Sequence, residues 1–179
     1  MKEIKLNQMP DVINECLQKC LNGEMKFANV MFVAEAKYEK YFHRVFSDWR
    51  EKQKDISMLF MPLPITPFSH EVNGILVPKL KDGKEQFCFA NNDIDAMNRP
   101  NSVVIFERFN WGQSEEGIAE TKDILKKRTY SPCYNNDTYV LNNLKLVVAT
   151  AYPDIKGYHN IDISNEIKES FEIYEIVRE

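Results

Sequence analysis

Polar side chains that could do chemistry follow three separate apolar runs of this sequence. Lys40 comes shortly after the run NVMFVA (29–34), Glu107 and Arg108 follow VVIF directly, and Tyr152 closes LVVATAY. In parallel α/β sheets, ligands bind at the carboxyl ends of the strands, so these residues are the first candidates for a site. Lys40 could hold a phosphate and Glu107 a metal ion. Arg108 stays protonated at any relevant pH and cannot act as a base.

The remaining nucleophilic and metal-ligating side chains show no catalytic spacing. The histidines form no H-x-x-x-H pair and the cysteines no C-x-x-C pair, so we expect neither a metal site nor a cysteine nucleophile. We expect the histidines at the surface or at helix caps, and the cysteines as reduced, mostly packed thiols. These residues are His43, His70, His159, Cys16, Cys20, Cys88 and Cys133, of which Cys88 and Cys133 fall on predicted hairpins.

The composition indicates a single folded domain over residues 1–179. Of the 179 residues 44% are apolar and 28% charged, and no repeat or flexible linker divides the chain. No apolar run is long enough to span a membrane and the start MKEIKLNQMP lacks a secretion signal, so we expect a cytoplasmic location and no membrane partner. Lys and Arg number 23 against 27 Asp and Glu, a net charge of -4 that argues against nucleic acid as a partner.

The elements that must position these residues alternate between strands and helices. We predict strands at 29–34, 56–61, 101–109, 144–152 and 171–179, and helices at 11–23, 38–53, 112–128 and 163–171. Two hairpins are expected, an insertion at 74–90 around Asp82-Gly83 and a smaller one at 129–141, while 1–28 forms a helix and lead-in. Strands separated by helices imply right-handed parallel units. The fold class is therefore α/β, a three-layer αβα sandwich with a mostly parallel five-stranded sheet.

The eight residues after the first predicted strand occupy the places of a phosphate-binding loop. They read AEAKYEKY where P-loop proteins carry G-x-x-x-x-G-K-[ST]. Lys40 holds the lysine place, but Ala34 and Glu39 replace the two glycines and Tyr41 replaces the magnesium-binding hydroxyl. Glu39 would put a carboxylate and a Cβ where a phosphate and a left-handed backbone are wanted.

Three more stretches lie in a matching order along the chain. They are VVIFERFN, LVVATAYP and IKESF, with the hairpin insertion between the second and third strands. Together with AEAKYEKY they resemble the landmarks of the α/β core of AAA+ ATPases, most closely the MoxR and dynein-related branch. The resemblance covers residues 29–177 and implies a P-loop-NTPase-like sheet.

The resemblance also implies that the residues for hydrolysis are replaced. Glu107 stands at the place of the magnesium-assisting Asp, Arg108 at that of the catalytic Glu, Tyr152 at that of the water-positioning Asn, and Ser170 at that of the arginine finger. The family's inner loop glycine is Lys37 here. The chain ends after the fifth predicted strand, where the family continues into a helical lid.

The altered residues predict an internal ion pair at the former nucleotide edge. A guanidinium is costly to bury without a partner, so we expect Arg108 to meet Glu107, Glu39 or Glu35 and to fill the crevice from within. A filled crevice would leave no room for a nucleotide.

We therefore expect a catalytically inactive AAA+-like domain that serves as a protein-binding, assembly or regulatory module. ATP and magnesium are not expected to bind, and the partner classes are another copy of this chain or an active AAA+ protein. Two alternatives stay open: a subunit that binds ATP weakly through Lys40 and Glu107 with help from a neighbour, or an unrelated α/β domain that binds a small ligand. The degenerate site positions are Ala34, Lys37, Glu39, Lys40, Tyr41, Glu107, Arg108, Tyr152 and Ser170, and Trp111 is a candidate contact residue.

Overall fold

A six-stranded parallel sheet forms the centre of the molecule. The structure is a computed structural model and describes residues 1–61, 66–67, 69–109, 119–134, 136–154 and 165–178. Within these residues the strand order is β1-β14-β2-β13-β10-β3, and every pairing is parallel. The strands are β1 (Lys2–Lys5), β2 (Ala28–Val33), β3 (Ser57–Met61), β10 (Ser102–Phe106), β13 (Leu144–Ala151) and β14 (Glu172–Val177).

The strands that were expected are present, but the sheet has one more than the five predicted. The extra strand is β1, which lies in the expected lead-in and pairs with β14 at the edge of the sheet. Its four residues are KEIK, too short and too polar to show the periodicity of a buried strand. Lysines are typical of an edge strand, where they discourage pairing with another chain.

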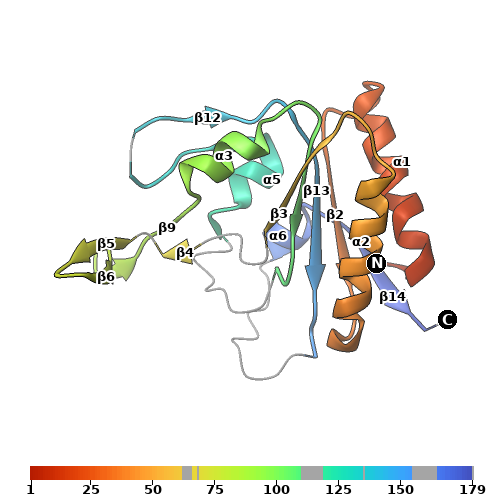
Figure 1. The fold of residues 1–179 in the computed structure, drawn as a ribbon, viewed down its shortest axis with the longest axis horizontal. Helices are drawn as coiled ribbons and strands as arrows, with labels where there is room; N and C mark the ends of the chain where they lie inside the picture. Colours follow the sequence, from red (N-terminus) through yellow and green to blue (C-terminus); the bar gives the residue numbers. More distant parts are fainter. Residues whose placement is uncertain (62–65, 68, 110–118, 135, 155–164, 179) are drawn as a thin grey trace.

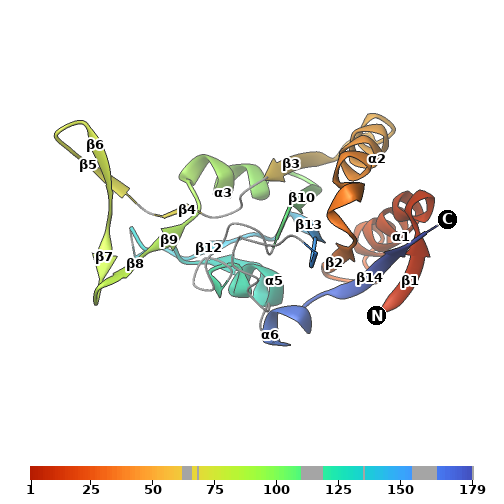
Figure 2. The same cartoon turned by 90° about the horizontal axis from the view of Figure 1, so that it is seen from below.

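Apolar side chains cover both faces of the sheet, as a parallel sheet requires. On one face α1 (Met9–Leu21) and α2 (Glu39–Glu51) pack on Val30, Val103 and Val148. On the other face lie three short helices, α3 (Asn91–Met97), α5 (Lys122–Lys127) and α6 (Asn165–Lys168), which contribute Ile94, Ile124 and Ile167 to a second cluster. Figure 2 shows the two groups of helices on opposite sides of the sheet.

The helices agree only in part with the sequence patterns. The predicted helices at 11–23 and 38–53 are α1 and α2, and 163–171 contains α6. Of the predicted helix at 112–128 the described residues contain α5, and residues 112–118 lie outside them. Helix α3 was not predicted, because its seven residues are too few to establish a helical repeat.

A narrow ribbon extends from the body at the end far from α1 (Figure 1 and Figure 2). It begins where β4 (Thr66–Pro67) pairs with β9 (Phe87–Cys88), and it continues as two successive hairpins. These pair β5 (Ser69–Val72) with β6 (Ile75–Pro78) and β7 (Leu80–Lys81) with β8 (Lys84–Glu85). A separate small hairpin pairs β11 (Thr129–Tyr130) with β12 (Tyr139–Val140), as expected for 129–141.

The predicted single hairpin at 74–90 is wrong in its pairing. The turn at Asp82-Gly83 is present, but Ile75–Pro78 pairs backwards with Ser69–Val72 across a second turn at Asn73-Gly74. Asn73 and Gly74 have φ of 50° and 78°, the left-handed pair that a tight hairpin turn needs. This turn was not predicted, because Gly74 was interpreted as the first residue of a strand.

Buried polar side chains tie the helices of the second face to the amino edge, where β2, β13 and β14 begin. The guanidinium of Arg128 donates to the carbonyl oxygens of Ala28, Ile124 and Leu144 at 2.8–2.9 Å. The amide of Asn29 donates to the carbonyls of Leu125 and Ser170, both at 2.9 Å. Among the described residues no helix is long and apolar enough to cross a membrane.

Candidate functional site

The connections between strands single out one place on the sheet for a ligand. The strands β2 and β13 are neighbours, but the chain leaves β2 toward β3 at one edge of the sheet and leaves β13 toward β14 on the other side of β2. Ligands of open α/β sheets bind outside the carboxyl ends of strands at such a switch point. We call the side of the sheet where β2, β10 and β13 end the carboxyl edge.

The structure brings most of the predicted residues to this carboxyl edge. Ala34 follows β2, Glu107 and Arg108 follow β10, and Tyr152 follows β13, while Glu39 is the first residue of α2. Ser170 is not among them. It precedes β14 at the amino edge, where its carbonyl accepts the Asn29 amide. Trp111 lies outside the described residues.

The backbone of residues 34–41 forms no cradle for a phosphate. After β2, the Ala34 N–H donates to the Ala151 carbonyl at 3.1 Å, and a 3-10 turn, η2 (Ala36–Tyr38), leads straight into α2. None of residues 34–41, all of which the structure describes, has a positive φ. Anion-binding nests need a left-handed residue next to a right-handed one, so the glycine replacements at Ala34 and Glu39 are accompanied by a different backbone path.

A carboxylate of the protein itself accepts from this turn. The Oδ1 of Asp154 accepts the Ala36 N–H at 2.8 Å. Next to it the Lys37 ammonium pairs with Glu35 at 2.7 Å and lies over the Tyr38 ring. The groups that could attract a phosphate here are thus already bound to acidic side chains of the chain. Asp154 was not predicted, although it follows a strand of the sheet within three residues.

The predicted ion pair of Arg108 is present, and its partner is Glu39. The guanidinium contacts the Glu39 carboxylate through both Nε and Nη2, with the two side chains 33% and 23% exposed. The backbone of Arg108 is left-handed, with φ of 49°. Its N–H donates to the Thr150 hydroxyl at 3.1 Å, and the next N–H, of Phe109, donates to the Thr150 carbonyl at 2.7 Å. Thr150 on β13 therefore fixes the turn that aims Arg108 at α2.

The Glu107 carboxylate is buried and is not accessible to a metal ion from solvent. Its side chain is 5% exposed and its Oε1 lies 3.0 Å from His43 Nε2 on α2. Burial and the nearby Glu39 carboxylate raise the pKa of Glu107 to about 7, and Arg108 opposes this shift. His43, expected as a plain surface or cap residue, also lies against the Phe60 ring. Glu107 can therefore take up a proton near neutral pH.

The other predicted positions have structural surroundings. Tyr152 is buried against the Phe42 ring, and burial raises its pKa. Lys40 and Tyr41 are exposed on the first turn of α2, where the Lys40 ammonium lies over the Tyr41 ring at 5.0 Å. Lys40 thus behaves as a surface residue of the helix. Among the described residues no group of three His, Cys, Asp or Glu is arranged to hold a metal ion.

A small cavity lies at the carboxyl edge between described residues. It has a volume of about 230 Å³ and is lined by Ala34 and Asp154 together with residues of β2 and β14. Ligand sites usually measure about 300–1,000 Å³, so this cavity is smaller than most of them.

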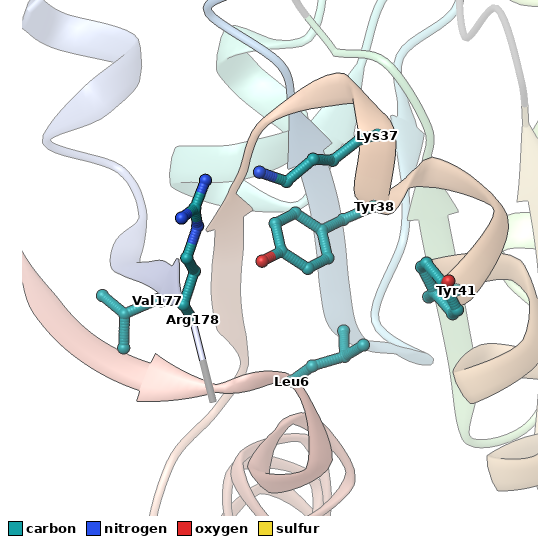
Figure 3. Close-up of a pocket in the computed structure, with 6 residues that line it drawn as sticks. All are labelled: Leu6, Lys37, Tyr38, Tyr41, Val177 and Arg178. Atoms are coloured by element: carbon teal, nitrogen blue, oxygen red, sulfur yellow. The ribbon is translucent and has the colours of Figure 1, made fainter.

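A larger pocket of about 600 Å³ lies beside the carboxyl edge. Figure 3 shows it between the turn that starts α2 and the end of β14, with the polar ends of Lys37, Tyr38 and Arg178 near one another and Leu6 below. This pocket was not predicted, because it depends on the unexpected pairing of β1 with β14. Its lining residues are Leu6, Lys37, Tyr38, Tyr41, Val177 and Arg178.

The chain matches no protein-family model and none of the curated proteins with which its sequence was compared. Function has to be argued from the site itself.

The attraction between Glu39 and Arg108 should stabilise the protein in addition to any effect of the left-handed backbone at Arg108. Changing either residue to Ala should lower the free energy of unfolding by about 1–2 kcal/mol, and the double variant should lose less than the sum. Urea denaturation of the four proteins measures this coupling. Arg108→Gly is the matched control. It removes the same charge but suits a left-handed φ, so it should be less destabilising than Arg108→Ala by about 0.5–1 kcal/mol. Additive losses would contradict the pairing.

Glu107 should make stability fall as pH rises toward neutrality. A carboxyl group whose pKa is raised from 4.5 to about 7 on folding favours the native state while protonated, so its contribution is complete below pH 4.5 and is lost as pH passes 7. Glu107→Gln should remove this loss. The variant should gain about 1–3 kcal/mol relative to the parent between pH 4.5 and 8, measured by denaturant unfolding. Glu51→Gln, an exposed change on α2, should leave the profile unaltered. Parallel curves for parent and Glu107→Gln would refute the assignment.

Proposed function

We propose that this chain is a catalytically inactive AAA+-like domain, with a P-loop-NTPase-like three-layer fold, that acts by binding another protein. The observation that carries the proposal is the hydrogen bond from the Ala36 N–H to Asp154. In this bond a carboxylate of the chain accepts the backbone N–H that a phosphate would accept in a nucleotide-binding loop. The Arg108–Glu39 pair supports the same conclusion on the neighbouring strand.

The surroundings of the two residues that could still bind ATP argue against residual ATPase activity. Lys40 lies over the Tyr41 ring at the surface, and Glu107 is buried beside His43. Phosphoryl transfer needs a metal ion, a backbone cradle and a group that positions water. Arg108, at the place of the catalytic carboxylate, is engaged by Glu39 and cannot accept a proton.

The ribbon supports the protein-binding part of the proposal. The β5–β6 register places Val72, Ile75 and Val77 on one face, and all three are exposed. Leu76, 72% exposed, lies on the opposite face of the same hairpin. A two-stranded hairpin is marginally stable in water by itself, and exposed apolar groups in such a cluster mark an interaction surface.

A second copy of this chain is the partner that we favour. In the strand pairings of the described residues β6 is joined to β5 alone, so an added strand could pair along the outer side of β6. Edge-to-edge pairing of two ribbons would satisfy the outer backbone groups of β6, and packing of the apolar faces against each other would cover the exposed side chains. An active AAA+ protein is the other partner class that the sequence resemblance implies.

The pocket of Figure 3 favours a second candidate function, the binding of a small ligand by an α/β domain unrelated to AAA+ proteins. Its volume of about 600 Å³ is that of a ligand site. Arg178 would give it a preference for an anion, and the tyrosines a planar surface. Arg178→Ala would weaken such binding without changing association through the ribbon.

ATP with magnesium should not bind, and hydrolysis should be undetectable. Because residues 34–41 offer no nest of N–H groups, isothermal titration should give no saturable heat in the micromolar range. Asp154→Ala, which frees the Ala36 N–H but leaves the backbone path, should not restore binding. A micromolar dissociation constant, or turnover that disappears in Lys40→Ala, would overturn the proposal.

Association should depend on the apolar residues of the ribbon. Light scattering after size exclusion should show a mass that rises with concentration for the parent chain, and Ile75→Lys with Leu76→Lys should abolish this rise. Val140→Lys, an equally polar change at another exposed apolar position, is the control and should associate like the parent. A parent that stays monomeric at all concentrations would exclude self-association.

A further inference from the structure

Two free thiols meet at the base of the ribbon. Cys88 lies on β9 and is buried, and Cys133 is exposed in the connection between β11 and β12. The two side chains are hydrogen-bonded to each other across a long separation in sequence. Burial and this contact raise the pKa of the Cys88 thiol.

Hydrogen bonds between residues near Cys88 and residues near Cys133 hold the two segments together. The Phe89 N–H, next to Cys88, donates to the Tyr130 hydroxyl at 2.8 Å. The Tyr134 hydroxyl, next to Cys133, donates to Asn91 Oδ1 at 2.5 Å and lies 3.4 Å from the Phe89 carbonyl oxygen. These hydrogen bonds keep the segment of Cys88 beside the segment of Cys133, as a disulfide between them requires.

The other two cysteines do not offer this arrangement. Cys16 and Cys20 lie one turn apart on α1 and are both buried. An oxidant in solution reaches neither sulfur, and burial raises the pKa of both thiols.

A cavity of about 400 Å³ gives access to Cys133. Lys81 and Lys84 from the β7–β8 hairpin line it, as do Glu85 and Glu120. Cations and carboxylates around one exposed sulfur suit a small molecule that carries both charges, such as a peptide disulfide.

We propose that Cys88 and Cys133 form a reversible disulfide by exchange with a low-molecular-weight peptide disulfide of the glutathione type. The bond would tie β9, at the base of the ribbon, to the β11–β12 hairpin. This inference does not depend on the proposed function.

The exchange balances in two steps. The Cys133 thiolate attacks one sulfur of oxidised glutathione, forms a mixed disulfide and releases one glutathione thiolate, which takes up the proton that Cys133 lost. Cys88 then loses its proton and attacks the Cys133 sulfur, displacing the second glutathione. The protein gives up two electrons and two protons, and oxidised glutathione becomes two thiols.

The order of the steps follows from access and acidity. Cys133 is exposed and reacts first. Burial, with the bond to Cys133, raises the pKa of Cys88 to about 12, so the second step needs a thiolate that is scarce at neutral pH. Its rate should rise about tenfold for each unit of pH in the neutral range.

Mass spectrometry of the full chain tests the proposal. The reduced protein is incubated with oxidised glutathione, alkylated, and examined intact and after digestion. The parent should lose the mass of two hydrogens and yield a peptide that links Cys88 to Cys133. Cys88→Ser should stop at the glutathione adduct on Cys133, and Cys133→Ser should not react. The Cys16→Ser, Cys20→Ser double variant is the control and should behave like the parent.

Three results would overturn the proposal. They are a stable glutathione adduct on the parent at every pH from 7 to about 9, a link that joins Cys133 of two copies, or a Cys88→Ser variant that gives the same product as the parent. Cys88→Ala serves as a second variant where Ser at this buried position disturbs folding. The thermal midpoint gives an independent readout, which should rise by several degrees on oxidation in the parent and not in either cysteine variant.

Discussion

The arrangement of the helices on the second face depends on the hydrogen bonds that the Arg128 guanidinium donates. A parallel sheet covered on both faces leaves carbonyls at its strand starts and at helix ends that water cannot reach. Arg128 donates to three of them, on β2, β13 and α5, and stacks on the Phe27 ring. Burial lowers its pKa to about 9, which leaves it charged at neutral pH. Its left-handed φ of 53° also ends α5, so one residue stops the helix and anchors it to the sheet.

At the carboxyl edge, too, charged side chains bind groups of neighbouring elements, but there the carboxylates are the acceptors. There Asp154 accepts a backbone N–H at the start of η2, and Glu39 engages the guanidinium of Arg108. Each contact joins a residue after one strand to the helix after another, which is the geometry that a bound ligand would otherwise complete. A polyphosphate entering this edge would have to break the Lys37–Glu35 and Arg108–Glu39 ion pairs and the hydrogen bond to Asp154, and residues 34–41 offer no nest in return.

The sequence predicted those features that depend on local pattern and missed those that depend on contacts between distant segments. The apolar runs of β2, β10 and β13 and the turn at Asp82-Gly83 could be predicted because a buried strand and a tight turn each have a local composition. The need of Arg108 for an acidic partner limited the candidates to Glu107, Glu39 and Glu35, and Glu39 is the partner. The roles of Asp154 and His43 could not be predicted, because their partners come from distant segments and are known only once the helix and the strands are placed. The charged strand β1 was missed because its pairing with β14, and not its own pattern, makes it a strand.

Exposed apolar side chains gather on the ribbon, whereas charges are balanced both there and at the carboxyl edge. At the carboxyl edge Lys37 is matched by Glu35 and Arg108 by Glu39, so little positive potential remains to attract an anion. On the ribbon the charges are balanced as well, but Ile75 and Leu76 are 67% and 72% exposed on opposite faces of a hairpin. Exposed apolar groups on a projecting element cost stability unless something covers them, whereas paired charges at a closed edge do not. The recognition surface of this domain is therefore expected on the ribbon, away from the edge where α/β sheets usually bind their ligands.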